Sequence, residues 1–116
     1  MKIVGSVKEN LGTEKRIAIT PDTAKKLLDL NLSIFLEKNY GEHLGISDEE
    51  YRKVGVSFLN TSKEVLEKSE IILKVNDISN DEIAEIKEKT ILIGQFDPFS
   101  NKDMLNQLIK KGIRVF

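Results

Sequence analysis

The sequence has no cysteine and a single histidine, His43. Without cysteine there are no disulfides, thiolate nucleophiles or cysteine metal sites, and one histidine excludes a histidine-rich metal centre. No apolar run approaches the roughly 20 residues that span a bilayer. The apolar run in "MKIVGSV" is also too short for a signal peptide. We therefore expect a cytoplasmic chain without a metal site, with no membrane insertion by this segment.

The chain also lacks an excess of charge of either sign. Eighteen Lys and Arg residues face 19 Asp and Glu residues, which gives a net charge of −1. This balance offers no electrostatic reason to expect nucleic acid or an anionic membrane as a partner. The length of 116 residues, with 40% apolar and 32% charged residues, fits one ordinary soluble domain.

Short β-type runs alternate with amphipathic stretches along the whole chain. The expected strands are 2–7, 33–38, 56–59, 71–75, 90–94 and 113–116. Strands that alternate with helices predict βαβ units, and hence an α/β domain with a mostly parallel sheet. The last apolar run stops at Phe116, inside a strand pattern. We expect from this that the sequence is a cut piece of a longer one, the alternative being a terminal edge strand.

Helix starts are marked by capping residues. Thr20 precedes Pro21, which predicts an N-cap and a first helical position for a helix over 19–30. Capping boxes predict three further starts; they pair Ser47 with Glu50, Thr61 with Glu64, and Ser79 with Glu82. A last helix is expected from about Asn101 to Lys111, ending at Gly112.

Ligands of open α/β sheets lie beyond the carboxyl ends of the strands, so candidate residues are sought there. Arg16 lies in the long connection 8–20, beside apolar residues, where its guanidinium could meet a carboxylate or phosphate. The residues alone favour a solvated loop arginine. Lys74 ends the most apolar strand and could act in acid–base or carbonyl chemistry. The residues alone favour a lysine whose stem packs while its ammonium reaches water.

Asp97 follows the fifth expected strand, just before Pro98. It could hold a ligand hydroxyl or orient Lys74, although a turn former is the commoner role of such an aspartate. No dinucleotide fingerprint, P-loop or nucleophile elbow occurs in the sequence. A phosphoacceptor receiver domain, which suits the size, would need acidic residues after the first strand. The sequence has Ser6, Val7 and Lys8 at that point.

Four segments carry a resemblance to a known family: "KENLGTEKRIAITPDTAKKL", "GISDEEYRKVGV", "SEIILKVN" with "DEIAEI" soon after, and "LIGQFDPFSNKDMLNQL". Over essentially its whole length the chain resembles the N-terminal part of the family uniting alanine dehydrogenase and the alpha subunit of proton-translocating NAD(P) transhydrogenase. The resemblance implies a flavodoxin-like or Rossmann-like three-layer domain over 1–116. In the family it packs beside a separate NAD-binding Rossmann domain, which is absent here, and the active cleft lies between the two.

The resemblance also implies roles for single residues. In alanine dehydrogenase, the arginine matching Arg16 binds the carboxylate of pyruvate, and the lysine matching Lys74 binds the substrate and assists at its carbonyl. The acid–base histidine of that enzyme is matched by Asp97. The unperturbed pKa of aspartate is about 3.9 against about 6.5 for histidine, so an aspartate does not readily replace the imidazole at neutral pH. Arg16, Lys74 and Asp97 therefore stay candidates on the substrate side of the cleft, and no catalytic residue is assigned.

"LKVN" and the "DP" after the fifth strand look more like the transhydrogenase alpha subunit. This implies hydride transfer between NADH and NADP⁺, coupled to proton movement, in the full-length protein. The implied partners are the rest of the alpha subunit, the beta subunit and a second copy in a homodimer. The resemblance implies that this soluble segment lies on the cytoplasmic side and is associated with the inner membrane through that complex. We expect the 116 residues alone neither to bind NAD(H) tightly nor to be active. The alternatives are an alanine dehydrogenase-like oxidoreductase and a free-standing α/β binding module.

Overall fold

The computed structural model describes residues 2–9, 12, 16–75, 80–94 and 102–116. Strands and helices alternate along this part of the chain, as predicted. Their order is β1 (Ile3–Ser6), α1 (Pro21–Asp29), β2 (Ser33–Glu37), η1 (Glu42–Leu44), α2 (Asp48–Val54), β3 (Ser57–Leu59), α3 (Ser62–Lys68), β4 (Ile71–Leu73), α4 (Asn80–Glu85), β5 (Ile91–Ile93), α5 (Lys102–Lys110) and β6 (Arg114–Val115).

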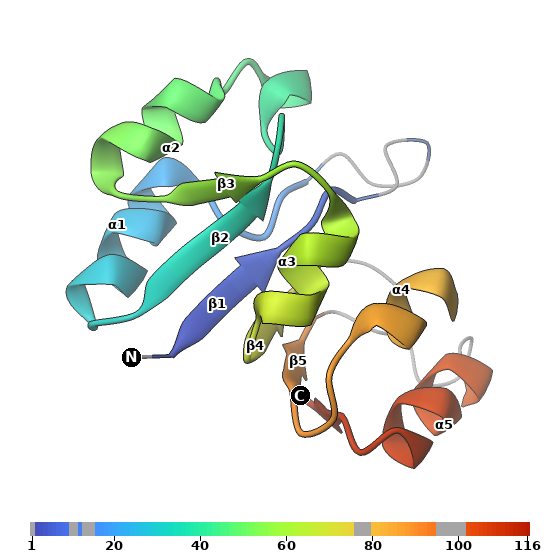
Figure 1. Cartoon of the computed structure of the whole chain (residues 1–116). Coiled ribbons are helices and arrows are strands. Elements are labelled where there is room, and N and C mark those ends of the chain that lie inside the picture. The colour runs from blue at the N-terminus through green and yellow to red at the C-terminus, as the bar shows by residue number, and fades with distance from the viewer. Residues whose placement is uncertain (1, 10–11, 13–15, 76–79, 95–101) are drawn as a thin grey trace.

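The strands form one sheet in the order β3-β2-β1-β4-β5-β6, and every pairing is parallel. The chain thus moves outward from β1 to β3, crosses back over the sheet, and moves outward again from β4 (Figure 1). This is the strand order of the Rossmann fold, whereas flavodoxin follows the order 2-1-3-4-5. The predicted α/β fold with a parallel sheet is confirmed, and the strand order selects the Rossmann-like form.

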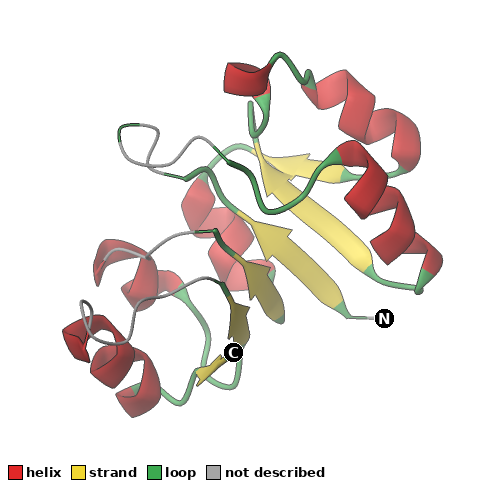
Figure 2. Ribbon diagram, turned by 180° about the vertical axis from the view of Figure 1, so that it is seen from behind, coloured by secondary structure: helices red, strands yellow, loops and turns green. Residues whose placement is uncertain are grey.

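Helices cover both faces of the sheet, which gives the three predicted layers. α1 and α2 lie on one face, and α3, α4 and α5 lie on the other (Figures 1 and 2). Each face has its own apolar core: one is built around Val4, Ile34 and Leu36, and the other around Leu66, Ile72 and Leu92. In the described part of the chain, no helix is long and apolar enough to cross a membrane.

The predicted caps account for the helix starts that the structure describes. The side chains of Thr20, Ser47 and Thr61 accept hydrogen bonds from the backbone N–H three residues later, at the starts of α1, α2 and α3. Ser79 and Asn101, the predicted starts of the last two helices, lie outside the described residues. β4 ends at Leu73 and not at Val75, so Lys74 lies just beyond the strand.

β1 and α3 approach each other closely at Gly5. A Cβ built on Gly5 would lie 1.8 Å from Ser69 Oγ, at the C-terminal end of α3. Ser69 Oγ in turn donates a hydrogen bond of 2.6 Å to the Val65 carbonyl. A residue without a side chain at position 5 therefore lets α3 lie directly on the central strand.

Candidate functional site

The carboxyl ends of β1 and β4 lie side by side at the centre of the sheet, where the strand order reverses. In open α/β sheets this switch point is the usual place for a ligand. A hollow of about 410 Å³ is found here, which we call the carboxyl-edge hollow. It is lined by Arg16, Ile17, Ala18, Leu73, Lys74, Val75, Ile93 and Gly94. The structure thus brings Arg16 and Lys74, two of the residues predicted from the sequence, to one site.

Lys74 is buried at this hollow and paired with a carboxylate. Its Nζ lies 3.2 Å from Oε1 of Glu9, and the two side chains are only 2% and 1% exposed. The second carboxylate oxygen, Oε2, accepts the backbone N–H of Val75 at 3.0 Å. The backbone N–H of Lys74 donates to the Ile93 carbonyl, which holds the residue beside β5. Both oxygens of Glu9 therefore fix the chain around Lys74.

This geometry corrects the interpretation that the residues alone favoured for Lys74. The ammonium does not reach water, because its whole side chain is enclosed and its charge is matched by Glu9. Buried charges are tolerated in proteins when they are paired and hydrogen-bonded in this way. A charge in a region of low dielectric constant at the wall of a hollow interacts more strongly with a ligand than a charge in water does.

Arg16 lies at the exposed rim of the same hollow. Arg16 and Lys74 both line the hollow, and the charge of Lys74 is paired with that of Glu9. The guanidinium offers a fork of N–H donors to a carboxylate or phosphate. Asp97, the third predicted candidate, lies outside the described residues. Within the described part of the chain, no three metal-ligating side chains come together.

The backbone between Arg16 and Thr20 is held against the sheet by Tyr40, which follows β2. The Tyr40 hydroxyl accepts the N–H of Ala18 at 3.0 Å and the N–H of Ile19 at 3.2 Å. It also lies 2.8 Å from Ser6 Oγ. Because Ser6 Oγ donates its own proton to the Leu73 carbonyl at 2.7 Å, the Tyr40 hydroxyl must be the donor to Ser6.

This network joins four parts of the site. It runs from the segment that carries Arg16, through Tyr40 and Ser6, to Leu73, the residue before Lys74. Tyr51 of α2 adds a hydrogen bond of 2.7 Å from its hydroxyl to the Ile19 carbonyl. The rim and the wall of the hollow are therefore positioned by one set of buried hydrogen bonds.

Burial makes both tyrosine hydroxyls weaker acids than a tyrosine in water. Desolvation raises the pKa of Tyr40 to about 12, and its hydrogen bonds with Ser6, Ile19 and Ala18 offset only part of that rise. Desolvation also raises the pKa of Tyr51, with a smaller contribution from Tyr40. Both hydroxyls thus stay protonated donors over the physiological pH range, as the network requires.

Sequence reasoning missed Glu9 and Tyr40. Glu9 follows the first strand closely, and Tyr40 follows the second, so both lie at the carboxyl edge where ligand sites occur. A polar residue at such a strand end was the available signal for each. Glu9 stands in the first segment that carries the family resemblance, but no role was predicted for it, and the partners of both residues are distant in the sequence.

Residues 5–116 match the family model described as "Alanine dehydrogenase/PNT, N-terminal domain". The chain belongs to this family. An NAD(P) transhydrogenase subunit alpha polypeptide of Rickettsia prowazekii is 34% identical over 100% of this chain and 31% of its own length. The alanine dehydrogenase of Methanococcus maripaludis is 32% identical over 96% of this chain and 30% of its own length.

Solved structures agree with these sequence matches. The transhydrogenase from Sinorhizobium meliloti superposes with a TM-score of 0.92 at 29% identity, over 99% of this chain and 34% of that one. An L-alanine dehydrogenase superposes with a TM-score of 0.90 over 97% of this chain and 31% of that one, at 20% identity, which shows the shared fold alone. This chain spans about a third of the length of each relative.

Proposed function

We propose that this chain is the N-terminal domain of an NAD(P) transhydrogenase alpha subunit. In the complete protein, the carboxyl-edge hollow forms part of the wall of the cleft in which hydride passes between NADH and NADP⁺. The similarity to the Rickettsia prowazekii alpha subunit along the whole chain supports this choice. The observation that carries it is the Lys74–Glu9 pair, a charge enclosed at the switch point of the sheet, where the fold places its ligands.

The domain supplies a charged wall and leaves nucleotide binding to other regions of the protein. Dinucleotides bind a Rossmann sheet through a glycine-rich turn after the first strand, which leads directly into a helix. Here β1 ends at Ser6 and α1 begins at Pro21, and no G-x-G-x-x-G occurs between them. The pyrophosphate cradle is therefore missing from this sheet. NAD(H) would bind in the remainder of the alpha subunit.

The proposed partners follow from the same assignment. They are the rest of the alpha subunit, a beta subunit and a second copy of the alpha subunit, with the inner membrane reached through the complex. In such a site the protein acts mainly by holding the two nicotinamides close and excluding water. Arg16 and Lys74 would line that space without forming a covalent bond to either nucleotide.

Calorimetric titration of the 116-residue chain with NADH tests whether nucleotide binding lies outside this domain. We expect no heat of binding in the micromolar range. Saturable micromolar binding that shifts the amide signals around the carboxyl-edge hollow would contradict the proposal, because it would place the nucleotide site at that edge of this domain. The polypeptide that joins this domain to its nucleotide-binding domain should then reduce an NADP⁺ analogue with NADH once its beta subunit is present.

The second candidate is an alanine dehydrogenase-like oxidoreductase. It is favoured by the fact that Arg16 and Lys74 line one hollow, which suits a small carboxylate substrate. Turnover of pyruvate, ammonia and NADH by the longer polypeptide, lost in Lys74→Ala, would favour this candidate over the first. The same assay without turnover leaves the transhydrogenase assignment in place.

A further inference from the structure

A second hollow lies at the opposite end of the sheet, near the amino ends of β4, β5 and β6. Its volume is about 350 Å³, and we call it the amino-edge hollow. Among the residues that line it are six charged ones: Lys2, Lys87, Lys89, Arg114, Glu70 and Glu88. They come from well-separated regions of the sequence, which the parallel sheet brings together. Neither the family assignment nor the proposed function uses this end of the molecule.

The charge at the amino-edge hollow is opposite in sign to that of the chain. Four cations and two carboxylates give the lining a net charge of +2, whereas the chain carries −1. One of the carboxylates is engaged, because Glu70 Oε2 accepts the backbone N–H of Ile3 at 3.3 Å. Within the described residues, none of the four cations lies in a salt bridge. The net positive charge of the lining favours binding of an anion.

Capping of helix ends does not account for these cations. Lysines at this edge of an α/β sheet commonly interact with the last carbonyls of the helices. Lys111 does so, since its Nζ donates to the carbonyls of Ile83 and Ala84 at 2.7 Å each. No such bond is made by the four cations of the hollow in the part of the chain that the structure describes. All four residues are exposed.

The backbone at Lys89 gives independent support. Lys89 has φ +68°, in the left-handed region that side chains other than Asn and Asp rarely adopt. The other two described non-glycine residues with positive φ, Asn31 and Asn39, belong to the tolerant type. The N–H of Lys89 donates to the Gly112 carbonyl at 3.0 Å, which ties its turn to the segment that leads into β6. Lys89 thus adopts an unfavourable backbone conformation at the point where it lines the hollow with Arg114.

We propose that the amino-edge hollow binds a small polyanion of the phosphate class, with the size of a diphosphate group. Arginine presents paired N–H donors to phosphate oxygens, and the lysines add compact positive charges around them. The volume lies in the range of small-ligand sites. A compact, multiply charged anion matches four cations around one hollow better than a singly charged carboxylate does. This inference is independent of the function proposed for the carboxyl edge.

The first test is a titration of the ¹⁵N-labelled 116-residue chain with inorganic pyrophosphate at low salt, followed by amide chemical shifts. We expect saturable shifts confined to the neighbourhood of Lys2, residues 87–91 and Arg114, and their loss at high salt. Absence of a saturable shift through the millimolar range overturns the proposal. ADP serves as a second probe. An affinity equal to that of pyrophosphate indicates that only the phosphates are recognised, and a higher affinity indicates that the ligand is a nucleotide.

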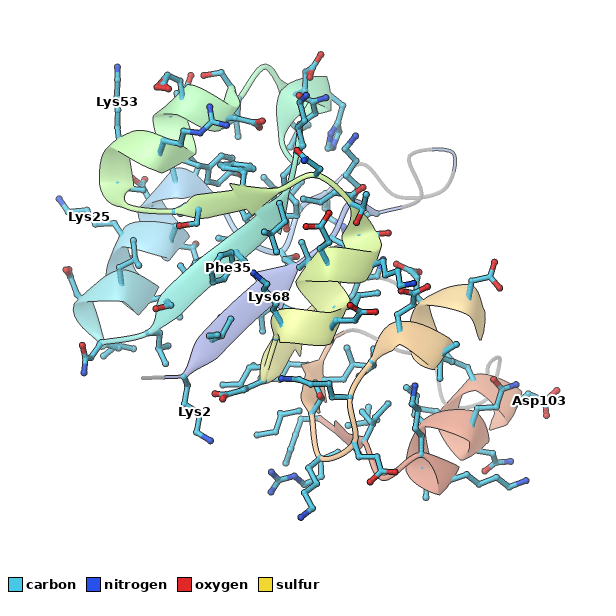
Figure 3. The ribbon with its side chains drawn as sticks, in the orientation of Figure 1. Lys2, Lys25, Phe35, Lys53, Lys68 and Asp103 are labelled. Carbon is cyan, nitrogen blue, oxygen red and sulfur yellow. The ribbon has the colours of Figure 1, made fainter. Side chains whose placement is uncertain are left out.

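Charge reversal with a matched control separates the hollow from the overall charge. Lys89→Glu and Lys53→Glu each change the net charge from −1 to −3. Lys53 is exposed on α2, far from the amino-edge hollow (Figure 3). We expect Lys89→Glu to weaken pyrophosphate binding about ten-fold or more, and Lys53→Glu less than about two-fold. Equal weakening by both variants shows a bulk charge effect and overturns the proposal.

Lys89→Gly separates the loss of the charge from a loss of stability. Glycine adopts φ +68° without strain, so this variant removes the charge and leaves the domain at least as stable as the wild type. We expect several-fold weaker pyrophosphate binding together with an unchanged or higher melting temperature. Unchanged binding in Lys89→Gly contradicts the proposal. A poly-glutamate peptide that binds as tightly as pyrophosphate contradicts the assignment to phosphates.

Discussion

Removing either member of the Lys74–Glu9 pair should strongly destabilise the domain. The two charges lie 3.2 Å apart with side chains that are 2% and 1% exposed. At that distance, with an effective dielectric constant of about 20, their attraction is about 5 kcal/mol. Glu9→Gln leaves the buried Lys74 ammonium without its counter-charge, and Lys74→Met leaves the buried Glu9 carboxylate without its ammonium partner. We expect each variant to lose about 3–5 kcal/mol of unfolding free energy.

Urea unfolding followed by circular dichroism measures this loss. With a slope of about 2 kcal/mol per molar urea, a loss of about 4 kcal/mol lowers the midpoint by about 2 M. The double variant Glu9→Gln/Lys74→Met removes both charges of this buried pair, so it should be more stable than either single variant. The coupling energy between the two substitutions should then be at least about 2 kcal/mol.

An exposed pair provides the control. Arg52 and Glu49 lie 3.7 Å apart in α2, with side chains that are 52% and 64% exposed. Glu49→Gln should cost less than about 1 kcal/mol because water screens such pairs. If Glu9→Gln costs as little as Glu49→Gln, or if the effects of the double variant simply add, the burial argument for Lys74 is refuted.

Three further predictions concern the buried network and the central strand. Tyr40→Phe should lower the unfolding free energy by about 1–3 kcal/mol, because it removes the hydroxyl that accepts the N–H groups of Ala18 and Ile19. Urea unfolding measures the loss. The pKa of Tyr40 is raised from 10.0 to about 12, so the unfolded chain releases this proton first. Stability should therefore fall as the pH rises from about 10 to about 12, and less steeply in Tyr40→Phe. Gly5→Ala should lower the melting temperature by placing a methyl group on Ser69, and Ser69→Gly should restore much of the loss.

Local signals in the sequence predicted most of the fold. The caps at Thr20, Ser47 and Thr61 depend on bonds to residues three positions away, so a short window of sequence contains all the information. The strand pattern depends on apolar residues next to one another, and the alternation of strands and helices implies the parallel sheet. The end of β4 was placed two residues late because Val75 extends the apolar pattern past Lys74, whereas the pairing with β5 ends at Leu73.

The site was less predictable because its partners are distant in the sequence. A lysine at a strand end is ordinarily solvated, and only a carboxylate brought beside it reverses that expectation. Glu9 is 66 positions from Val75, the residue whose N–H it accepts, and the two meet only because β1 and β4 are neighbours in the sheet. Tyr40 and Ala18 are likewise 22 positions apart. The roles of Arg16 and Lys74 in the longer protein remain predictions.

The connection between β1 and α1 explains how the candidate site of a Rossmann-like sheet can be built from side chains instead of a helix terminus. A glycine-rich turn would bring the amino end of the first helix to the switch point, where its N–H groups bind phosphate. In this chain the amino end of α1 is already capped, since Thr20 accepts the N–H of Thr23. The longer connection is instead held down by Tyr40 and Tyr51. The charges at the carboxyl edge therefore come from side chains, and single substitutions can change them without altering the sheet.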